Sequence, residues 1–405
     1  GQKIAESVGS CQDGARLTSG PKPPDKPTID PAHHSDRRGG CHAMGGRRFT
    51  GQRACRELET ETEPGRQNEM HGAVIYGKGD VRFETRKDPE ILEPTDAIVR
   101  TIATCVCGSD LWRYRGINEV PEPTPIGHEY VGVVEGIGED VRNVKPGDFV
   151  VGGFTTSDNT CPVCKKGATA NCQNGGFYDG CQAEKIRVAH ADGTLVSIPG
   201  GVDRDLVPSL LTLSDVACTG WHGAVSALAG PGRSVAVVGD GAVGLCAILA
   251  AKQLGADPVI AMSRHPNRQA IAREFGADAV VAERGEEGAQ KVRELTEGIG
   301  ADGVVEAVGT EGARQQAAVC VRPGGMIGVV GVPHGAPDIS DFRNNVGVWG
   351  GIAPVRAYLE RLVELVLERK INPGRVFDLE LPLSEVAEAY AAMDERRAIK
   401  ALLWP

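Results

Sequence analysis

The hydrophobic pattern of the chain changes character several times, and each stretch predicts a different kind of structure. From residue 70 to about 155 the apolar residues fall in short runs divided by turns: AVIY, AIVRTIAT, GHEYVGVVEGIG and GDFVVGG. Short β-rich runs bounded by turn residues such as Pro146-Gly147-Asp148 are typical of strands joined by tight turns. This stretch therefore predicts a compact, mostly antiparallel β domain.

A regular alternation of strand and helix follows between residues 234 and 332. The predicted strands are 234–240, 258–263, 279–282, 303–309 and 325–332, and the helices between them are 241–255, 267–277, 286–298 and 313–321. This alternation is typical of βαβ units, which assemble into a doubly wound parallel sheet. A helical stretch from about residue 205 precedes the region, and helices at 354–370 and 384–394 follow it.

The first 69 residues differ in composition and predict no folded domain. They contain six Leu, Ile, Val or Phe residues, too few to bury a core. Arg47 and Arg48 are not followed by an apolar segment, so they do not indicate an export signal. We expect a disordered extension at 1–69. Because strand-like alternation starts at Met70, we interpret Met70 as the natural start.

Charge and cysteine content narrow the class of protein. A formal net charge of −10 disfavours nucleic acid or an anionic membrane as the main partner. No apolar run reaches the roughly 18 residues that a membrane span requires. Of the 12 cysteines, seven lie between positions 105 and 218. The spacing Cys161-x-x-Cys164 is typical of metal ligation in a reducing compartment, which predicts a cytoplasmic protein.

A glycine-rich loop predicts a dinucleotide site. Gly239-Asp240-Gly241-Ala242-Val243-Gly244 follows a predicted strand and opens a predicted helix, the context that separates a cofactor loop from a mere tight turn. Gly239 permits the turn, Gly241 lets the pyrophosphate approach the backbone, and Gly244 allows close packing of helix and strand. The helix N-terminus and Val243 would complete the phosphate site.

The end of the second strand predicts which dinucleotide binds. NAD sites usually carry an acid there, which binds the ribose 2′-hydroxyl. Here the strand ends in Ser263 and Arg264, with Arg268 beyond them and no acid. A 2′-phosphate would meet a hydroxyl and cations, so NADP is favoured. The alternative is that NAD binds and Arg264 lies over the adenine ring.

A second constellation predicts zinc. Cys107 follows a β run, and His128 and Glu129 begin another about twenty residues later. A thiolate and an imidazole on adjacent loops, with carboxylates nearby, are the ligands of a tetrahedral zinc site. We interpret Cys105 as an inert buried thiol.

These motifs together resemble the zinc-containing medium-chain dehydrogenase/reductase family over essentially all of 70–405. The resemblance rests on CGSD at 107–110, GHE at 127–129, the cysteine lobe at 158–172, GDGAVG at 239–244 and VGVP near 331. The stretch Asp215-x-x-x-Thr219-Gly-Trp-His-Gly is most similar to the bacterial NADP-dependent secondary-alcohol branch. The family has a β-rich GroES-like catalytic domain, expected here at 70–219 and 351–405, and a Rossmann domain, expected at 220–350.

The resemblance implies roles for the residues of the first zinc site. Cys107, His128 and Asp215 would ligate a catalytic zinc, and Glu129 would be an alternate ligand that exchanges with water. Ser109 would relay the proton, and Asp110 would orient the site. Two alternatives stay open for the third ligand: Asp215 as a helix N-cap, and Cys218 as the ligand instead. We expect His222 to serve packing and hydrogen bonding, and Trp112, where many relatives carry a relay histidine, to wall the substrate pocket.

The resemblance also implies a structural zinc lobe. The family pattern C-x2-C-x2-C-x7-C matches Cys161, Cys164 and Cys172, and its first ligand falls on Asp158. An aspartate oxygen is an acceptable zinc ligand. The alternative is an empty, vestigial loop, and Cys181 is not expected to ligate.

The sequence thus predicts a zinc-dependent oxidoreductase that transfers hydride between an alcohol and a ketone or aldehyde, with NADP favoured and NAD possible. An NADPH-dependent reductase of activated alkenes or iminium ions is the alternative on the same fold, and a non-catalytic NADPH-binding protein is a third. The expected partners are small molecules, without nucleic acid or membrane, in a homodimer or homotetramer.

Overall fold

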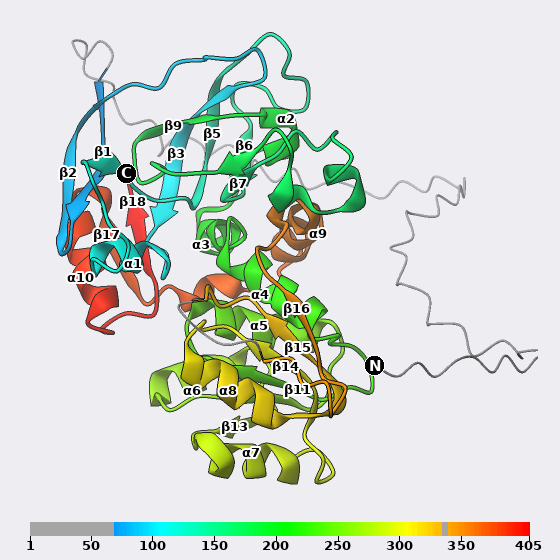
Figure 1. Cartoon of the computed structure of the whole chain (residues 1–405). Coiled ribbons are helices and arrows are strands. Elements are labelled where there is room, and N and C mark those ends of the chain that lie inside the picture. The colour runs from blue at the N-terminus through cyan, green and yellow to red at the C-terminus, as the bar shows by residue number, and fades with distance from the viewer. Residues whose placement is uncertain (1–68, 334–338) are drawn as a thin grey trace, which may run out of the picture. The chain divides into compact units, whose positions relative to one another are not determined.

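The computed structural model describes residues 69–333 and 339–405 (Figure 1). The predicted extension at 1–69 lies outside the described residues except for Glu69, which begins strand β1. Within the described residues, the two large sheets belong to one compact unit. The predicted boundary at 219–220 falls inside helix α4 (Val216–Ser226), which packs against α5 (Ala242–Gln253) of the cofactor region. The division into two domains stays a prediction.

The first large sheet builds the β-rich part. Its order is β10 (Leu195–Ile198), β6 (Phe149–Gly152), β5 (Tyr130–Ile137), β3 (Ala97–Cys105), β18 (Ala401–Trp404) and β17 (Leu379–Pro382). Strand β9 (Lys185–Val188) also pairs with β3. Every pair is antiparallel except β17 with β18, so the mostly antiparallel prediction is confirmed.

Smaller elements complete this part. A second sheet contains β1 (Glu69–Gly77), β2 (Asp80–Lys87) and β4 (Thr124–Pro125), and β7 (Thr155–Thr156) pairs with β8 (Gly176–Phe177). The helices are α1 (Asp110–Tyr114), α2 (Ala191–Thr194), α3 (Val207–Thr212), α9 (Val355–Leu367) and α10 (Val386–Asp394). The single-turn helices are Cys164–Lys166, Thr169–Asn171, Arg204–Leu206, Pro373–Val376 and Leu383–Glu385.

The second large sheet is parallel, as predicted. Its order is β13 (Ala279–Val281), β12 (Val259–Met262), β11 (Val235–Val238), β14 (Ala301–Glu306), β15 (Val321–Val329) and β16 (Gly347–Gly350). Its helices are α5, α6 (Pro266–Glu274), α7 (Gly285–Glu294) and α8 (Glu311–Cys320). Strand and helix therefore alternate at the predicted positions, with ends shifted by a few residues.

Helices cover both faces of the parallel sheet, because its strands present apolar side chains to two separate cores. Val235 and Val237 join the core that includes α4 and α5, whereas Ala236 and Val238 join the core that includes α7 and α8. Alternation of side chains along the strand assigns successive residues to opposite faces. This double burial explains why the strands read as continuous apolar runs.

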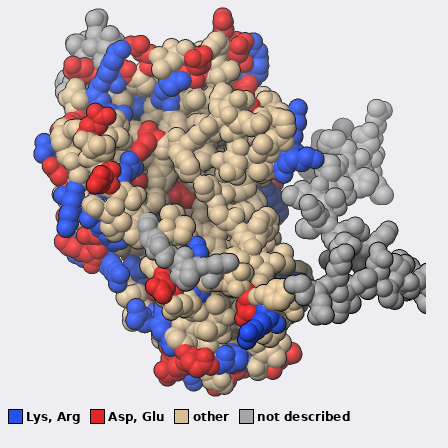
Figure 2. Space-filling view, in the orientation of Figure 1, with Lys and Arg blue, Asp and Glu red and all other residues tan. Residues whose placement is uncertain are grey.

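No helix in the described ranges is long and apolar enough to cross a membrane. On the face seen in Figure 2, basic and acidic side chains are interspersed.

Candidate metal centre and cofactor cleft

Four predicted metal-site residues come together at the ends of three elements. Cys107 follows β3, and His128 and Glu129 immediately precede β5, which pairs with β3. Asp215 stands at the start of α4. One ligand atom from each residue lies within 4.8 Å of the others. The Asp215 Oδ2 atom is 3.2 Å from Cys107 Sγ and 3.3 Å from His128 Nε2.

Asp110 holds the imidazole in place. Its Oδ1 atom is 3.3 Å from His128 Nδ1, and its Oδ2 atom accepts the Cys107 backbone N–H at 3.1 Å. Burial alone would raise the pKa of Asp110, but His128 and these bonds outweigh burial and hold the pKa below its ordinary value. Because Nδ1 faces Asp110, Nε2 is the nitrogen that faces Cys107 and Asp215.

The donor set fits a divalent cation. Burial and the neighbouring Asp215 carboxylate raise the pKa of the Cys107 thiol to about 11. A cation among the four residues would offset both effects, because a coordinated thiol is deprotonated. Within the described residues, the buried Glu129 Oε2 atom has no hydrogen-bond partner. Thiolate, imidazole and carboxylate are the ligands that zinc takes in proteins.

The alternatives for the third ligand can be compared directly. Asp215 occupies the N-cap position of α4, but in the described structure its side chain makes no capping bond to the backbone. Its Oδ1 atom instead accepts the Thr219 hydroxyl at 2.7 Å. Cys218 is buried and does not belong to the four-residue group. His222 bonds Tyr358 Oη at 3.0 Å, in the packing role expected of it.

Sequence reasoning missed Lys400, which contacts the metal group from the far end of the chain. Its Nζ atom lies 2.6 Å from Glu129 Oε1 and donates to the Val106 carbonyl at 3.1 Å. Both charged side chains are at most 1% exposed. No local motif could have indicated this pair, because 271 positions separate the two residues.

The cysteine lobe also gathers the four predicted residues. Ligand atoms of Asp158, Cys161, Cys164 and Cys172 lie within 4.8 Å of one another. The Asp158 N–H points to Cys172 Sγ at 3.3 Å, and the Cys164 N–H points to Cys161 Sγ at 3.4 Å. Three sulfur atoms and a carboxylate fit zinc, and these N–H groups would support bound thiolates.

Asp158 already accepts hydrogen bonds inside its own turn. Its Oδ1 atom accepts the N–H groups of Thr160 and Cys161, and its Oδ2 atom accepts the Asn174 amide at 2.6 Å. The bond from the Cys161 N–H is the largest cause of the lowered pKa of Asp158. Asp158 therefore shapes the turn, whatever else it binds.

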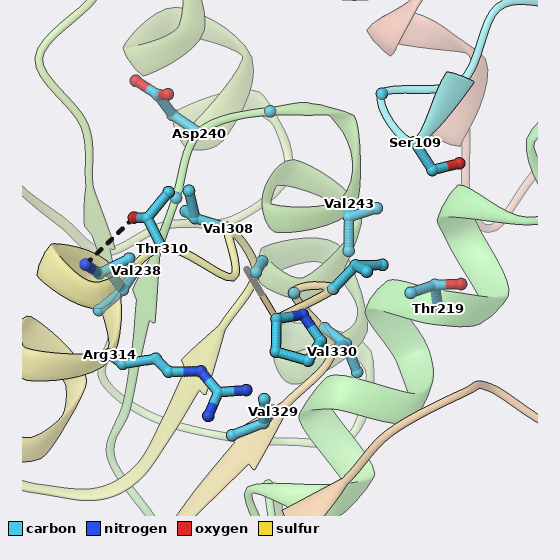
Figure 3. A pocket seen from close by; sticks show the side chains of 18 of the residues that line it. Ser109, Thr219, Val238, Asp240, Val243, Val308, Thr310, Arg314, Val329 and Val330 are labelled. Carbon is cyan, nitrogen blue, oxygen red and sulfur yellow. Dashed lines mark hydrogen bonds between the residues drawn. The ribbon is translucent and has the colours of Figure 1, made fainter. Parts of the chain in front are cut away.

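A cleft of about 1620 Å³ joins the metal group to the parallel sheet. Ser109, His128 and Asp215 line one part, and the glycine-rich loop lines another. Figure 3 shows Ser109 and Thr219 at one side of this pocket and Asp240 at the other, with Val243, Val308 and Val330 between them. Ser109 Oγ lies 3.3 Å from Cys107 Sγ. Trp112 also lines the cleft.

The glycine loop has the geometry that a dinucleotide requires. Gly239 has a φ of +118°, a backbone conformation that favours glycine. A Cβ on Gly241 would meet no protein atom within 4 Å, which leaves this side of the loop open to a ligand. A Cβ on Gly244 would lie 2.0 Å from the Gly239 carbonyl oxygen, so the third glycine permits the close packing predicted.

Asp240 of the glycine-rich loop contacts two of the three residues predicted to bind the adenosine ribose, Ser263 and Arg268. Arg264 and Arg268 line the cleft, but Ser263 is buried and donates to Asp240 Oδ2 at 2.7 Å. Arg268 forms an ion pair with Asp240 Oδ1 at 3.3 Å. The strand end carries no acid, as predicted, yet Asp240 supplies one from the glycine loop. Sequence reasoning treated this position only as a spacer.

Arg284 was also missed. It lies in the turn between β13 and α7, and it lines the cleft together with Arg264. Its guanidinium donates to the carbonyls of Glu283 and Met262, each at 3.4 Å. Burial and then the positive charge of Arg264 lower the pKa of Arg284. No local sequence pattern predicts that Arg284, which follows the third strand of the alternating region, lines the cofactor cleft.

Glu306, at the end of β14, orders another cleft-lining loop. Its Oε1 atom accepts the N–H groups of Val308 at 2.8 Å and Gly309 at 2.7 Å. Burial raises the pKa of Glu306.

Comparisons with known proteins agree with this geometry. Residues 93–200 match the alcohol dehydrogenase GroES-like domain, and residues 242–362 match the zinc-binding dehydrogenase family. Zinc-type alcohol dehydrogenase B of Aspergillus flavus is 32% identical over 83% of this chain and 81% of its own length. A probable zinc-binding alcohol dehydrogenase of Mycobacterium tuberculosis is 34% identical over 81% of this chain and 86% of its own.

A solved structure extends the match to the fold. Alcohol dehydrogenase TADH from Thermus sp. ATN1 superimposes with a TM-score of 0.76 at 34% identity, over 83% of this chain and 99% of that chain. The chain belongs to the zinc-dependent medium-chain alcohol dehydrogenase family, and it is an oxidoreductase.

Proposed function

We propose that this enzyme interconverts an alcohol and a ketone or aldehyde, with Cys107, His128 and Asp215 as ligands of a catalytic zinc. The observation that carries the proposal is the convergence of these three residues on the cleft that also contains the glycine-rich loop. Bound zinc supplies a Lewis acid toward the substrate oxygen, and bound nicotinamide accepts or supplies the hydride.

The chain's own residues then position the substrate and move its proton. The Ser109 hydroxyl borders both the metal group and the cleft, so it can relay a proton: it accepts the proton of an alcohol while its own proton passes to water in the cleft, and the relay runs in reverse when a carbonyl is reduced. Asp110 fixes the His128 ring, and Lys400 holds Glu129 at the edge of the group. The Trp112 side chain forms one wall of the substrate pocket.

We propose NADP as the preferred cofactor, on the charge balance around the adenosine end of the cleft. Asp240 forms an ion pair with Arg268, whereas Arg264 and Arg284 form no ion pair with a carboxylate in the described part of the chain, although the Asp240 charge also acts on Arg284. Two guanidinium groups match a phosphate through charge-assisted hydrogen bonds. The cytoplasmic location and the homodimeric or homotetrameric assembly stay predictions from the sequence.

The alternative reaction is reduction of an activated alkene or iminium ion. That reaction needs neither an intact ligand set nor the relay hydroxyl, and this chain retains Cys107, His128, Asp215 and Ser109. The test is a panel of ketones, aldehydes and enones, with NADPH oxidation followed with and without a zinc chelator. Chelator-sensitive reduction of ketones or aldehydes is expected. Enone reduction that resists the chelator would favour the alternative, and no turnover with NADPH or NADH would contradict both.

A further inference from the structure

Asp240 brings a carboxylate to the end of strand β12, which has no acid of its own. Asp240 lies in the glycine-rich loop, two residues after β11 ends, and Ser263 directly follows β12. The two strands are parallel neighbours with Val238 opposite Met262, so the segments that follow them lie side by side. The Asp240 Oδ2 atom accepts the Ser263 hydroxyl at 2.7 Å. The carboxylate is therefore bonded to the strand end where an NAD site usually carries its acid.

The same carboxylate engages residues that a 2′-phosphate would otherwise bind. Arg268 Nη1 lies 3.3 Å from Asp240 Oδ1 and 3.4 Å from the Asp240 carbonyl oxygen. Ser263 has a single hydroxyl hydrogen, so it cannot donate to a phosphate while it donates to Asp240. A phosphate placed here would also meet the like charge of Asp240. Two of the groups predicted to select NADP are thus held by an acid that opposes it.

The rest of the adenosine end has the opposite charge. Arg264 and Arg284 line the cleft, and neither forms an ion pair with a carboxylate among the described residues. In Figure 3 Asp240 lies on the other side of the pocket from Ser109, away from the metal group. The cleft therefore offers two kinds of partner at this end: guanidinium groups for a phosphate, and a carboxylate for a hydroxyl.

We infer that Asp240 is a specificity-determining residue, whose carboxylate accepts the adenosine 2′-hydroxyl of NAD and keeps NAD usable in a cleft whose arginines favour NADP. A hydroxyl donates to a carboxylate in a charge-assisted hydrogen bond, and a fully ionised phosphate has no hydrogen to donate. The inference rests on the proposed nicotinamide-linked function. It concerns the relative binding of the two cofactors and not the reaction.

The test is fluorescence titration of the zinc-loaded enzyme with NADH and with NADPH. Asp240→Asn keeps the size of the side chain and removes its charge. We expect this variant to bind NADH about tenfold more weakly, the difference between a charged and a neutral hydrogen bond, and to bind NADPH more tightly. Glu286→Gln is the matched control, because Glu286 lines the same cleft but pairs with Arg293 and is 77% exposed. The control should leave the ratio of the two dissociation constants within twofold of the wild-type value.

The Arg268→Ala background separates a direct contact from an effect through Arg268. If Asp240 binds the ribose itself, adding Asp240→Asn to Arg268→Ala should again weaken NADH binding about tenfold. A loss confined to the enzyme that retains Arg268 would overturn the inference, because Asp240 would then act only on that side chain. Equal changes for NADH and NADPH in Asp240→Asn would also overturn it.

These titrations need no turnover, so they separate this inference from the proposed function. An enzyme that shows the expected cofactor binding but oxidises no alcohol and reduces no carbonyl would overturn the proposed function and support the role of Asp240. A wild-type enzyme that prefers NAD, with the expected response to Asp240→Asn, would contradict the proposed NADP preference alone.

Discussion

At the scale of single residues, Asp215 links the start of helix α4 to the metal group. It stands where a helix often begins with an acid, but its two oxygens face Thr219 on one side and Cys107 and His128 on the other. Burial pushes the pKa of this carboxyl upward, but the hydrogen bond and charge of His128 outweigh burial and bring the pKa to about 2. The carboxylate is therefore charged in the physiological pH range and available to a metal.

Replacement of Asp215 by alanine tests this role. We expect Asp215→Ala to lose about one zinc per chain and all measurable turnover, because a three-ligand site would retain only Cys107 and His128. NADPH binding, measured by fluorescence titration, should stay nearly unchanged. Cys218→Ala, one turn along the same helix, is the control and should keep its zinc. If Asp215→Ala retained full zinc content and Cys218→Ala did not, the ligand assignment would be wrong.

We expect substitutions of Arg264 and Arg268 to affect cofactor preference to different degrees, because only Arg268 is paired with a carboxylate, that of Asp240. Arg264→Ala should lower kcat/KM for NADP at least tenfold more than for NAD, since a charged hydrogen bond contributes about 1.5–3 kcal/mol. Arg268→Ala should discriminate less, because Asp240 already pairs with that guanidinium. Steady-state kinetics with both cofactors measures the difference. An equal loss for NADP and NAD in Arg264→Ala would show that Arg264 stacks on the adenine.

At the scale of elements, a feature could be predicted from the sequence when the residues that define it lie close together in the chain. The strand–helix alternation, the glycine loop and the cysteine spacings are patterns within a few residues, and the structure has each of them. Helix ends were less accurate: the predicted helix at 286–298 ends at Glu294. Lys400 was missed because the fold alone brings it to Glu129, and Arg284 was missed because the fold alone places it beside the cleft with Arg264. The sequence analysis assigned roles to the glycines on either side of Asp240 but gave no role to the Asp240 carboxylate.

The cysteine lobe at 158–172 is expected to contribute to stability and not to catalysis, and substitutions of Asp158 test this. Asp158 both shapes the turn and faces three sulfur atoms, and two substitutions separate these roles. Asp158→Ala should lose the lobe zinc and lower Tm. Asp158→Asn keeps an oxygen that can accept the two backbone N–H groups, but an amide is a poorer zinc ligand than a carboxylate. Asp158→Asn should therefore also bind this zinc more weakly, as elemental analysis after dialysis would show. Unchanged zinc content and Tm in Asp158→Asn would mean that the carboxylate serves the turn alone.

At the scale of the whole molecule, the end of the chain completes the part that holds the metal group. Strand β18 inserts between β3 and β17, so residues near 400 lie beside residues near 105. The core that contains Ala73 and Leu111 is closed by Tyr390 from α10. Lys400 lies just before β18 and reaches Glu129, and this buried ion pair joins the C-terminal strand to the segment that carries the metal group.

Removal of the Lys400 charge should therefore affect folding and not the metal group alone. Lys400→Met leaves Glu129 buried without its counter-charge, and breaking a buried pair in this way costs roughly 3–5 kcal/mol. Urea denaturation of the chelator-treated protein measures the loss without a contribution from bound zinc. The double variant Lys400→Met with Glu129→Gln should recover most of it, because no uncompensated charge then remains. A loss below about 1 kcal/mol in the single variant would mean that water reaches Glu129 and that the pair does not fasten the C-terminal strand.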